Sequence, residues 1–155
     1  MAKEAKKTLK ESPGLFRYHS PNIPMAAIRR HARRIAEKFD PERIILFGSY
    51  AYGQPHEWSD VDILVMMRAR NQLDQSLRIV LAVEAPFPLD LIVRTPKRLQ
   101  RDWEDGDWFL REILARGKVL YRYPGDNASK KQALTALRHA ESVRKAIRAR
   151  LALPP

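Results

Sequence analysis

Three short apolar runs, at residues 44–47, 61–66 and 89–93, constrain the fold of this chain more than any other feature of its sequence. Each run has the length of a buried β-strand, and a glycine and a serine directly after the first one indicate a tight turn. The segment between the second and third runs carries apolar residues at helical spacing and predicts a crossover helix: Leu73, Leu77, Val80 and Leu81. We therefore expect an α/β (α+β) fold, a small mixed β-sheet backed by helices.

Further helices and a closing strand flank these runs. Residues 24–39 place apolar side chains at steps of three and four after a proline, which predicts an amphipathic helix with an arginine-rich outer face. A helix is expected over residues 107–116, ended by Gly117, with a short strand at 118–121. Apolar residues at helical spacing then predict a basic helix near the end of the chain: Ala136, Ala140, Val143, Ile147 and Leu151.

These elements divide the chain into three parts. Residues 1–23 mix lysines with Ser-Pro pairs and lack a sustained period, so they are expected to form a mobile N-terminal arm. Residues 24–123 are expected to form one domain, because a chain of 155 residues can bury one sizeable core and little more. Residues 124–155 are expected to form a basic helical extension.

The composition excludes several kinds of site. The chain has no cysteine, which excludes disulfides, thiolate zinc sites and cysteine nucleophiles. No apolar run is long enough to cross a bilayer and the first residues are charged, so no membrane is expected as a partner and a cytoplasmic location is predicted. The formal charge of +11 favours polyanions. Basic residues without a docking motif are more often solvated helix faces, so nucleic acid stays an open but unfavoured partner.

Asp60 and Asp62, at the entry to the second apolar run, are the central candidates for a functional site. Alternate residues of a strand point to one face, so the two carboxylates are expected to lie together, where a bound cation would offset their repulsion. Asp90 lies inside the third run and turns to the face opposite Leu89 and Leu91. If the two strands are neighbours, three carboxylates converge, and such hard oxygen ligands suit Mg²⁺ bound together with substrate phosphates.

Gly48 and Ser49, directly after the first run, are candidates for binding those phosphates. Glycine lets the backbone turn sharply and approach a phosphate closely, and the serine hydroxyl and nearby amides can donate hydrogen bonds to phosphate oxygens. A Gly-Ser pair after a strand is by itself common in structural turns, so its significance comes from its distance to the acids.

The spacing of these residues resembles a known motif. A glycine–serine pair, ten further residues, an Asp-x-Asp pair and an aspartate on a later strand are similar to the Gly-Ser-x10-Asp-x-Asp signature of the DNA polymerase β-like nucleotidyltransferase superfamily. The residues that carry this resemblance are Gly48, Ser49, Asp60, Asp62 and Asp90. Within the superfamily, residues 47–53 and 58–65 are most similar to the minimal nucleotidyltransferase group, and the resemblance covers roughly residues 25–121.

The resemblance implies a nucleotidyltransferase fold and a transferase that moves a nucleoside monophosphate, with ATP as the expected donor, onto an acceptor hydroxyl. Gly48 and Ser49 would bind the triphosphate. Asp60 and Asp62 would bind two Mg²⁺ ions, and Asp90 would hold one of them while helping to activate the acceptor. These three acids are thus the implied catalytic and metal-binding residues.

The same resemblance implies a partner. Minimal nucleotidyltransferases are frequently encoded beside a small helical protein of the HEPN class and form a toxin–antitoxin pair with it, in which the transferase is the antitoxin. Some of these antitoxins transfer AMP from ATP to a tyrosine of the toxin. A HEPN-type toxin is therefore the expected protein partner and acceptor of this chain.

Other interpretations stay open at the level of the sequence. Taken singly, Asp60 could cap a turn and Asp62 could be a solvated strand residue. Asp90 could pair with Arg94, which could instead contact phosphate. A small-molecule transferase similar to aminoglycoside nucleotidyltransferases is the alternative enzyme, although such proteins usually carry a further helical domain. A non-catalytic module that binds a partner or nucleic acid is the alternative without chemistry.

Overall fold

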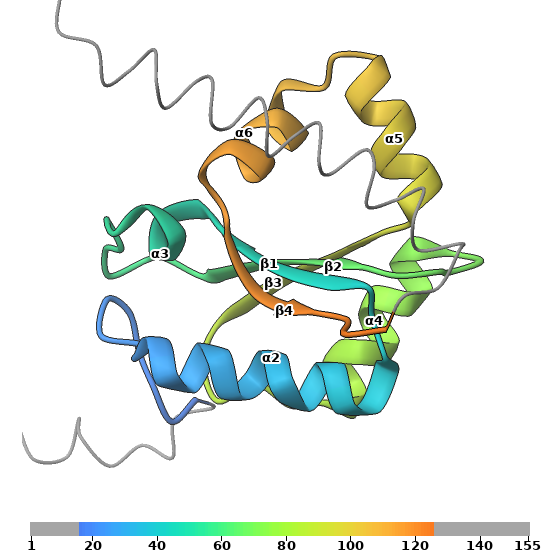
Figure 1. The fold of residues 1–155 in the computed structure, drawn as a ribbon. Helices are drawn as coiled ribbons and strands as arrows, with labels where there is room; N and C mark the ends of the chain where they lie inside the picture. The colour runs from blue at the N-terminus through green and yellow to red at the C-terminus, as the bar shows by residue number, and fades with distance from the viewer. Residues whose placement is uncertain (1–15, 126–155) are drawn as a thin grey trace, which may run out of the picture.

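The computed structural model describes residues 16–125, which form one four-stranded sheet with helices on both faces (Figure 1). The strands are β1 (Arg43–Phe47), β2 (Val61–Met66), β3 (Leu89–Arg94) and β4 (Lys118–Arg122). Their order in the sheet is β3-β2-β1-β4; β1 is antiparallel to both of its neighbours, and β2 and β3 are parallel. The prediction of a small mixed sheet backed by helices is confirmed.

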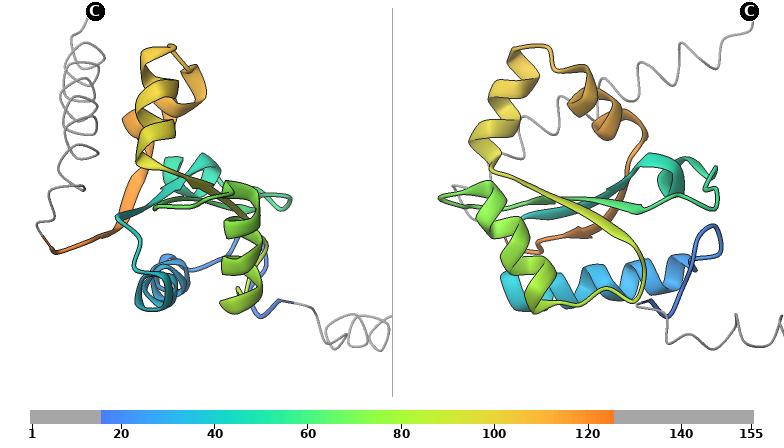
Figure 2. Two further views of the ribbon diagram at one scale, coloured as in Figure 1. Left: turned by 90° about the vertical axis from the view of Figure 1, so that its right-hand side faces the viewer. Right: turned by 180° about the vertical axis from the view of Figure 1, so that it is seen from behind.

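The helices form a layer on each side of this sheet. They are α2 (Met25–Phe39), α3 (Gly48–Tyr52), α4 (Gln72–Ala82), α5 (Pro96–Glu104) and α6 (Trp108–Arg116). Figures 1 and 2 show α2 and α4 on one side of the sheet and α5 and α6 on the other, with the short α3 beside one end of the strands. The sheet is therefore the middle of three layers, and both of its faces are covered.

Alternate residues of the strands belong to two apolar cores, because successive side chains point to opposite faces. The core on the side of α2 and α4 contains Ile44, Leu46, Val61, Ile63, Val65, Leu91 and Val93 from the sheet. The core on the side of α5 and α6 contains Ile45, Phe47, Leu64 and Met66, packed against Leu99, Leu110 and Ile113. Asp62 alternates in step with Leu64 and Met66, so it lies on the same face of the sheet as the second core.

α4 is the predicted crossover helix between β2 and β3, but it packs through a different face from the one that its apolar spacing indicates. The four apolar residues of the pattern are all exposed, with relative accessibilities of 69% for Leu73, 54% for Leu77, 41% for Val80 and 84% for Leu81. Ile79 and the following Val83 are buried instead and belong to the core. The prediction of a crossover helix is therefore confirmed, and the face that the helix buries is not the one that carries this apolar spacing.

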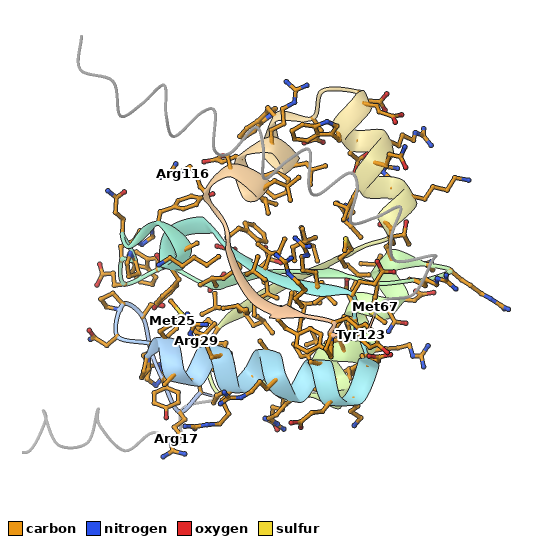
Figure 3. The ribbon with its side chains drawn as sticks, in the orientation of Figure 1. Arg17, Met25, Arg29, Met67, Arg116 and Tyr123 are labelled. Carbon is orange, nitrogen blue, oxygen red and sulfur yellow. The ribbon has the colours of Figure 1, made fainter. Side chains whose placement is uncertain are left out.

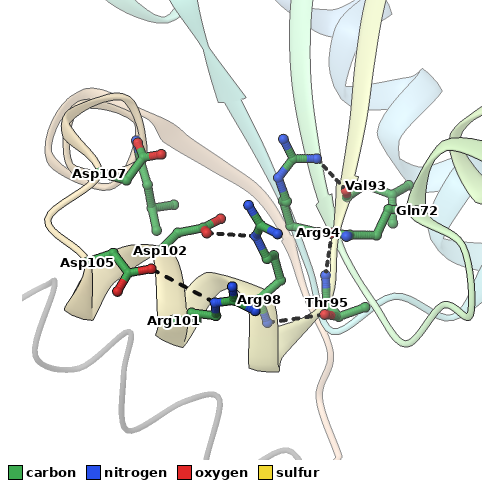
Figure 4. A network of polar contacts seen from close by, with 10 residues as sticks. Gln72, Val93, Arg94, Thr95, Arg98, Arg101, Asp102, Asp105 and Asp107 are labelled. Atoms are coloured by element: carbon green, nitrogen blue, oxygen red, sulfur yellow. Dashed lines mark hydrogen bonds and ion pairs between the residues drawn. The ribbon is translucent and has the colours of Figure 1, made fainter.

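A polar network joins α4, β3 and the start of α5 (Figure 4). The Oγ1 atom of Thr95 accepts a hydrogen bond from the Arg98 N–H at 3.2 Å and so caps α5, while Pro96 occupies the first turn. The Thr95 N–H donates to the side-chain oxygen of Gln72 at 3.3 Å. Arg98 also pairs with Asp102 at 2.7 Å on the surface of α5. These contacts fix the direction in which the chain leaves β3.

The segment before α2 contacts the loops at the other end of the sheet. The Tyr18 N–H donates to the Pro86 carbonyl at 2.8 Å. The Ser20 hydroxyl lies 2.9 Å from the Tyr50 hydroxyl and donates to the carbonyl of Ser59. One side chain thus connects α3 to the residue before Asp60.

Some expectations fall on parts of the chain that the structure does not describe. The predicted basic helix over residues 136–151 lies outside the described residues, as do residues 1–15 of the predicted N-terminal arm. Among residues 16–125, no helix has the length and apolar character that crossing a membrane would require.

Candidate active site

Asp62 and Asp90 lie opposite each other on neighbouring strands. Each is the second residue of its strand, and the parallel register of β2 and β3 pairs the two positions directly. Both alternate in step with residues of the second core, Leu64 and the partly buried Ile92, so both are on the face of α5 and α6. The condition that the sequence left open, that these two strands are neighbours, is met.

Asp62 is the acid whose ionisation the fold disfavours. Burial, followed by the negative charges of Asp90 and Asp60, raises its pKa from 3.8 to about 6. Asp62 is half-buried, whereas the other two acids are exposed. A carboxylate held near two like charges is unfavourable without a cation, and such perturbed groups gather at functional sites.

Gly48 brings the backbone of the first turn against Asp62. Its φ of +67° is in the left-handed region, which glycine adopts readily. A Cβ at this position would overlap the Oδ2 atom of Asp62. Gly48 is therefore required both by the turn and by the close approach of the carboxylate, a reason that the sequence did not reveal.

Ser49 and the rest of the short helix α3 follow Gly48 directly in the chain. The Ser49 carbonyl accepts hydrogen bonds from the N–H groups of Gly53 and Gln54, which closes this short helix. The Arg116 guanidinium, at the end of α6, lies 3.8 Å from the centre of the Tyr52 ring, and Figure 3 shows Arg116 projecting from α6 above α3. Burial, followed by the charge of Glu112, raises the pKa of Tyr52.

Asp60 is presented by a loop with internal hydrogen bonds. The buried Ser59 accepts a hydrogen bond at its Oγ from the His56 N–H at 2.9 Å. The next residue along, Val61, donates its N–H to the Pro88 carbonyl at 2.9 Å and begins β2. The exposed Asp60 is thus held between a fixed serine and the first residue of a strand.

The donor atoms fit a magnesium ion that arrives with its substrate. Within residues 16–125, no group of three or more His, Cys, Asp or Glu side chains is arranged to hold a metal ion by itself. Mg²⁺ commonly uses only one or two carboxylates and completes its shell with water and substrate phosphates. Asp62 and Asp90 supply such a pair of hard oxygen donors, and a cation would relieve the repulsion that raises the pKa of Asp62. The binding of ions by all three acids stays a prediction.

Three aromatic residues near the acids have a placement that sequence reasoning missed. Phe47 pairs with Asp62 across β1 and β2, so the ring and the carboxylate share a face. Phe109 meets Phe47 edge to face at 5.6 Å and Trp108 at 6.2 Å. Trp108 is 73% exposed, although a tryptophan beside a helix is usually buried. The helix predicted over residues 107–116 already placed Trp108 at a helix start, where Asp107 is the cap, but did not indicate that its side chain faces solvent.

Arg94 does not take the role of a partner for Asp90. Its guanidinium donates to the carbonyl of the preceding Val93 at 3.0 Å (Figure 4). The half-buried arginine shares a face of β3 with the acid but lies four residues further along the strand, at its far end. The alternative interpretation of Asp90, as the ion-pair partner of Arg94, is therefore not supported by the structure.

The chain shares short, well-matched segments with two proteins of Methanocaldococcus jannaschii. It is 42% identical over 38 residues to "Putative protein adenylyltransferase MJ1215" and 41% identical over 44 residues to "Putative protein adenylyltransferase MJ1379". These segments cover 24% and 28% of this chain and 44% of each relative, so the match spans less than half the length of either relative.

A likeness to solved structures is more distant. One is a chain from the complex of a tri-AMPylated Shewanella oneidensis HEPN toxin with an MNT antitoxin, at 15% identity and a TM-score of 0.39 over 84% of this chain and 100% of that one. Another is the structure of "a putative nucleotidyltransferase from Sulfolobus solfataricus", at 15% identity and a TM-score of 0.43 over 67% of this chain and 86% of that one. Scores of this size do not establish a shared fold by themselves.

The nucleotidyltransferase domain family matches this chain over residues 28–121. This range runs from α2 to β4 and contains the glycine–serine turn and all three acids. It also coincides with most of the region for which the motif resemblance was noted, and the predicted family is confirmed. The chain belongs to the nucleotidyltransferase domain family.

Proposed function

We propose that this chain transfers AMP from ATP to a hydroxyl group of a protein. The observation that carries the proposal is the position of Asp62. It is paired with Asp90 across β2 and β3, and its carboxylate lies against the backbone of the Gly48 turn. A carboxylate pair that needs a cation and a glycine turn that admits close backbone approach are the two halves of a phosphoryl-transfer site.

The reaction is a displacement at the α-phosphorus of ATP. The acceptor oxygen forms a bond to that phosphorus, and the bond from the phosphorus to the bridging oxygen of the β-phosphate breaks. The hydroxyl proton is taken up by a carboxylate, and pyrophosphate leaves with the electron pair of the broken bond. Most of the catalysis in such a reaction is positioning and neutralisation of charge.

The residues of the site have separate parts in this reaction. Asp60 and Asp62 would hold two Mg²⁺ ions, with Asp90 sharing one of them and accepting the proton of the acceptor. Bound Mg²⁺ supplies charge neutralisation on the attacking and leaving oxygens. Gly48 and Ser49 would contact the triphosphate with backbone N–H groups and the serine hydroxyl.

The acceptor is proposed from two sources. Both Methanocaldococcus jannaschii relatives carry the name "Putative protein adenylyltransferase", which favours a protein acceptor over a small molecule. The motif resemblance to minimal nucleotidyltransferases favours a tyrosine of a HEPN-type toxin and an antitoxin role. The chain would then silence its partner by adenylylation.

The test is incubation of the purified chain with α-labelled ATP and Mg²⁺, with and without the HEPN-class product of a neighbouring gene. We expect label on the partner, dependent on Mg²⁺ and lost in Asp62→Asn. Label on an aminoglycoside but not on protein would replace the protein acceptor with a small molecule. ATP that neither binds in the presence of Mg²⁺ nor labels any acceptor would leave a non-catalytic module and contradict the proposal.

A further inference from the structure

Three aromatic rings in succession lead from the candidate active site to the surface. Phe47 lies opposite Asp62 on the neighbouring strand, so their Cβ atoms are roughly 5 Å apart on one face of the sheet. The ring centres of Phe47 and Phe109 are 5.6 Å apart, and those of Phe109 and Trp108 are 6.2 Å apart. Phe47, Phe109 and Trp108 thus form an aromatic row that begins beside a proposed metal ligand.

The row becomes more exposed with distance from the acids. The relative accessibility rises from 7% at Phe47 to 39% at Phe109 and 73% at Trp108. Outside α4, the large apolar side chains that are exposed in the described part of the chain are Trp58, Trp108 and Phe109, all of them aromatic. Trp58 precedes Asp60 by two residues. The exposed apolar surface near the acids is therefore made of flat rings, whereas that of α4 is aliphatic.

The outer rings are held by a capped helix start. The Asp107 Oδ1 atom accepts a hydrogen bond from the Leu110 N–H at 2.8 Å, and the Asp107 carbonyl accepts from the Arg111 N–H at 3.1 Å. Leu110 is buried in the core beneath α6. Rings fixed in this way lose little freedom when a ligand binds, so the row is preorganised as a binding surface.

α6 carries a cation at its other end. The Arg116 guanidinium lies 3.8 Å from the centre of the Tyr52 ring, and its Nη1 atom is 3.2 Å from the Oε1 atom of Glu112. The Arg116 side chain is still 55% exposed. Tyr52 follows Gly48 by four residues, so the two share one side of α3. The guanidinium therefore lies beside the proposed phosphate-binding turn, and its planar fork suits phosphate oxygens.

The two ends of α6 together describe an elongated ligand. The helix has nine residues and a length of roughly 13 Å. A ligand that meets both ends needs a flat apolar group at one of them and anionic groups at the other. A nucleoside triphosphate has this polarity, and its base is one sugar away from the α-phosphate that the acids would hold.

We propose that the aromatic row is the base subsite of the nucleotide donor. The base stacks on Trp108 and Phe109, the α-phosphate lies at Asp62, and the terminal phosphates extend toward the Gly48 turn and Arg116. This inference rests on the proposed function and adds to it the residues that select the donor.

Stacking also sets the class of donor. An aromatic surface accepts any base and favours those that stack strongly, because it does not read the hydrogen-bonding edge. We therefore expect Mg-ATP and Mg-GTP to bind with similar affinity, and Mg-CTP and Mg-UTP to bind more weakly. Trp108→Ala should narrow the difference between purines and pyrimidines.

The first experiment measures binding by calorimetry on the full chain, with Mg-ATP and with Mg-tripolyphosphate, which has no base. Trp108→Ala should weaken binding of Mg-ATP roughly tenfold and leave Mg-tripolyphosphate unchanged. Trp108→Phe keeps a ring and should retain most of the affinity. Leu81→Ala is the matched control, because Leu81 is 84% exposed on the opposite side of the sheet, and it should bind both ligands normally.

The second experiment tests the direction of the nucleotide. Arg116→Gln should weaken binding of Mg-ATP and of Mg-tripolyphosphate alike, because both ligands carry the terminal phosphates. Arg101→Gln is its control, since Arg101 is also an exposed arginine paired with an acid four residues away. A loss in Arg116→Gln that is confined to Mg-ATP would overturn the proposed direction.

The outcomes separate this inference from the proposed function. If the unchanged protein binds neither ligand, both fail. If it binds Mg-ATP and Trp108→Ala binds it equally well, the base subsite alone is overturned. A Trp108→Ala variant with normal affinity for Mg-ATP that no longer labels the protein partner would assign the row to the acceptor, which also overturns the base subsite.

Discussion

Gly48 and Asp62 lie so close together that any side chain at position 48 would occupy the space of the aspartate carboxylate. The two residues come from different elements, the start of α3 and the start of β2. The contact joins the proposed phosphate-binding turn to the proposed metal ligand, and a change in one of them should be felt at the other.

Gly48→Ala is expected to destabilise the fold by about 1–3 kcal/mol and to abolish nucleotide transfer, because the methyl group displaces the Asp62 carboxylate. Gly53→Ala is the matched control, since Gly53 also has a positive φ of 76° but has open space around the position of a Cβ. Urea unfolding of both variants separates backbone strain from overlap. Equal losses in the two would show that the contact with Asp62 is unimportant. Adding Asp62→Ala to Gly48→Ala should recover part of the lost stability.

Asp62→Asn is expected to stabilise the protein while it removes activity. Unfolded aspartate ionises near pH 3.8 and Asp62 in the fold near pH 6, so the folded state binds more protons between these values and rising pH lowers its stability. The variant removes this penalty, which we place on the order of 1–2 kcal/mol because Asp62 is partly solvated. Thermal melting should show the gain above pH 6 and none below about pH 4. An Asp62→Asn variant that is less stable than the unchanged protein at pH 8 would contradict the prediction that the ionised Asp62 destabilises the fold.

The transfer reaction should decline in acid with the ionisation of Asp62. The carboxylate must be ionised to bind a cation, and its pKa in the fold is about 6, so kcat/KM is expected to fall as the pH drops below this value. At saturating ATP and Mg²⁺ the decline in kcat should move to lower pH, because a bound cation favours the ionised form. Initial rates across the pH range give both profiles. A kcat/KM profile that is flat down to pH 5 would contradict the assignment.

His31 should make the protein sensitive to acid independently of the active site. Burial, with a smaller effect of Arg34, lowers its pKa to about 4, and neither ring nitrogen has a hydrogen-bond partner among the described residues. An unfolded histidine takes up its proton near pH 6.5, so stability is lost as the pH falls from this value toward 4, by at most about 3 kcal/mol. His31→Leu should reduce this loss in urea unfolding, and His19→Leu, at an exposed position, should not. The same loss in His31→Leu would assign the acid sensitivity to other groups.

The strands and the acids could be predicted because each is a local pattern. Apolar runs of strand length identified β1, β2 and β3 to within one residue at their ends. The Asp-x-Asp pair at the start of β2 can be recognised from adjacent residues alone. The pairing of β2 with β3 in register, which brings Asp62 beside Asp90, depends on the whole sheet and is not written in any one segment.

α5 was not predicted because its sequence offers little apolar periodicity. Leu99 is its one buried residue, and most of its other positions are charged. Thr95 and Pro96 are a typical helix start and would have indicated it. The face that α4 buries does not follow from its apolar spacing either. Apolar spacing shows that a helix has an apolar face, but not whether this face meets the sheet or another molecule.

Ser20 has a consequence for where the folded unit begins. The family match starts at residue 28, yet the Ser20 hydroxyl connects Tyr50 of α3 to the carbonyl before Asp60, and Tyr18 is bonded to the loop before β3. A fragment trimmed to the matched range would keep the motif and release the two loops that present it. The residues just before the matched range thus hold the loops of the candidate active site in place, and a fragment that contains only the family match is expected to be too short to work.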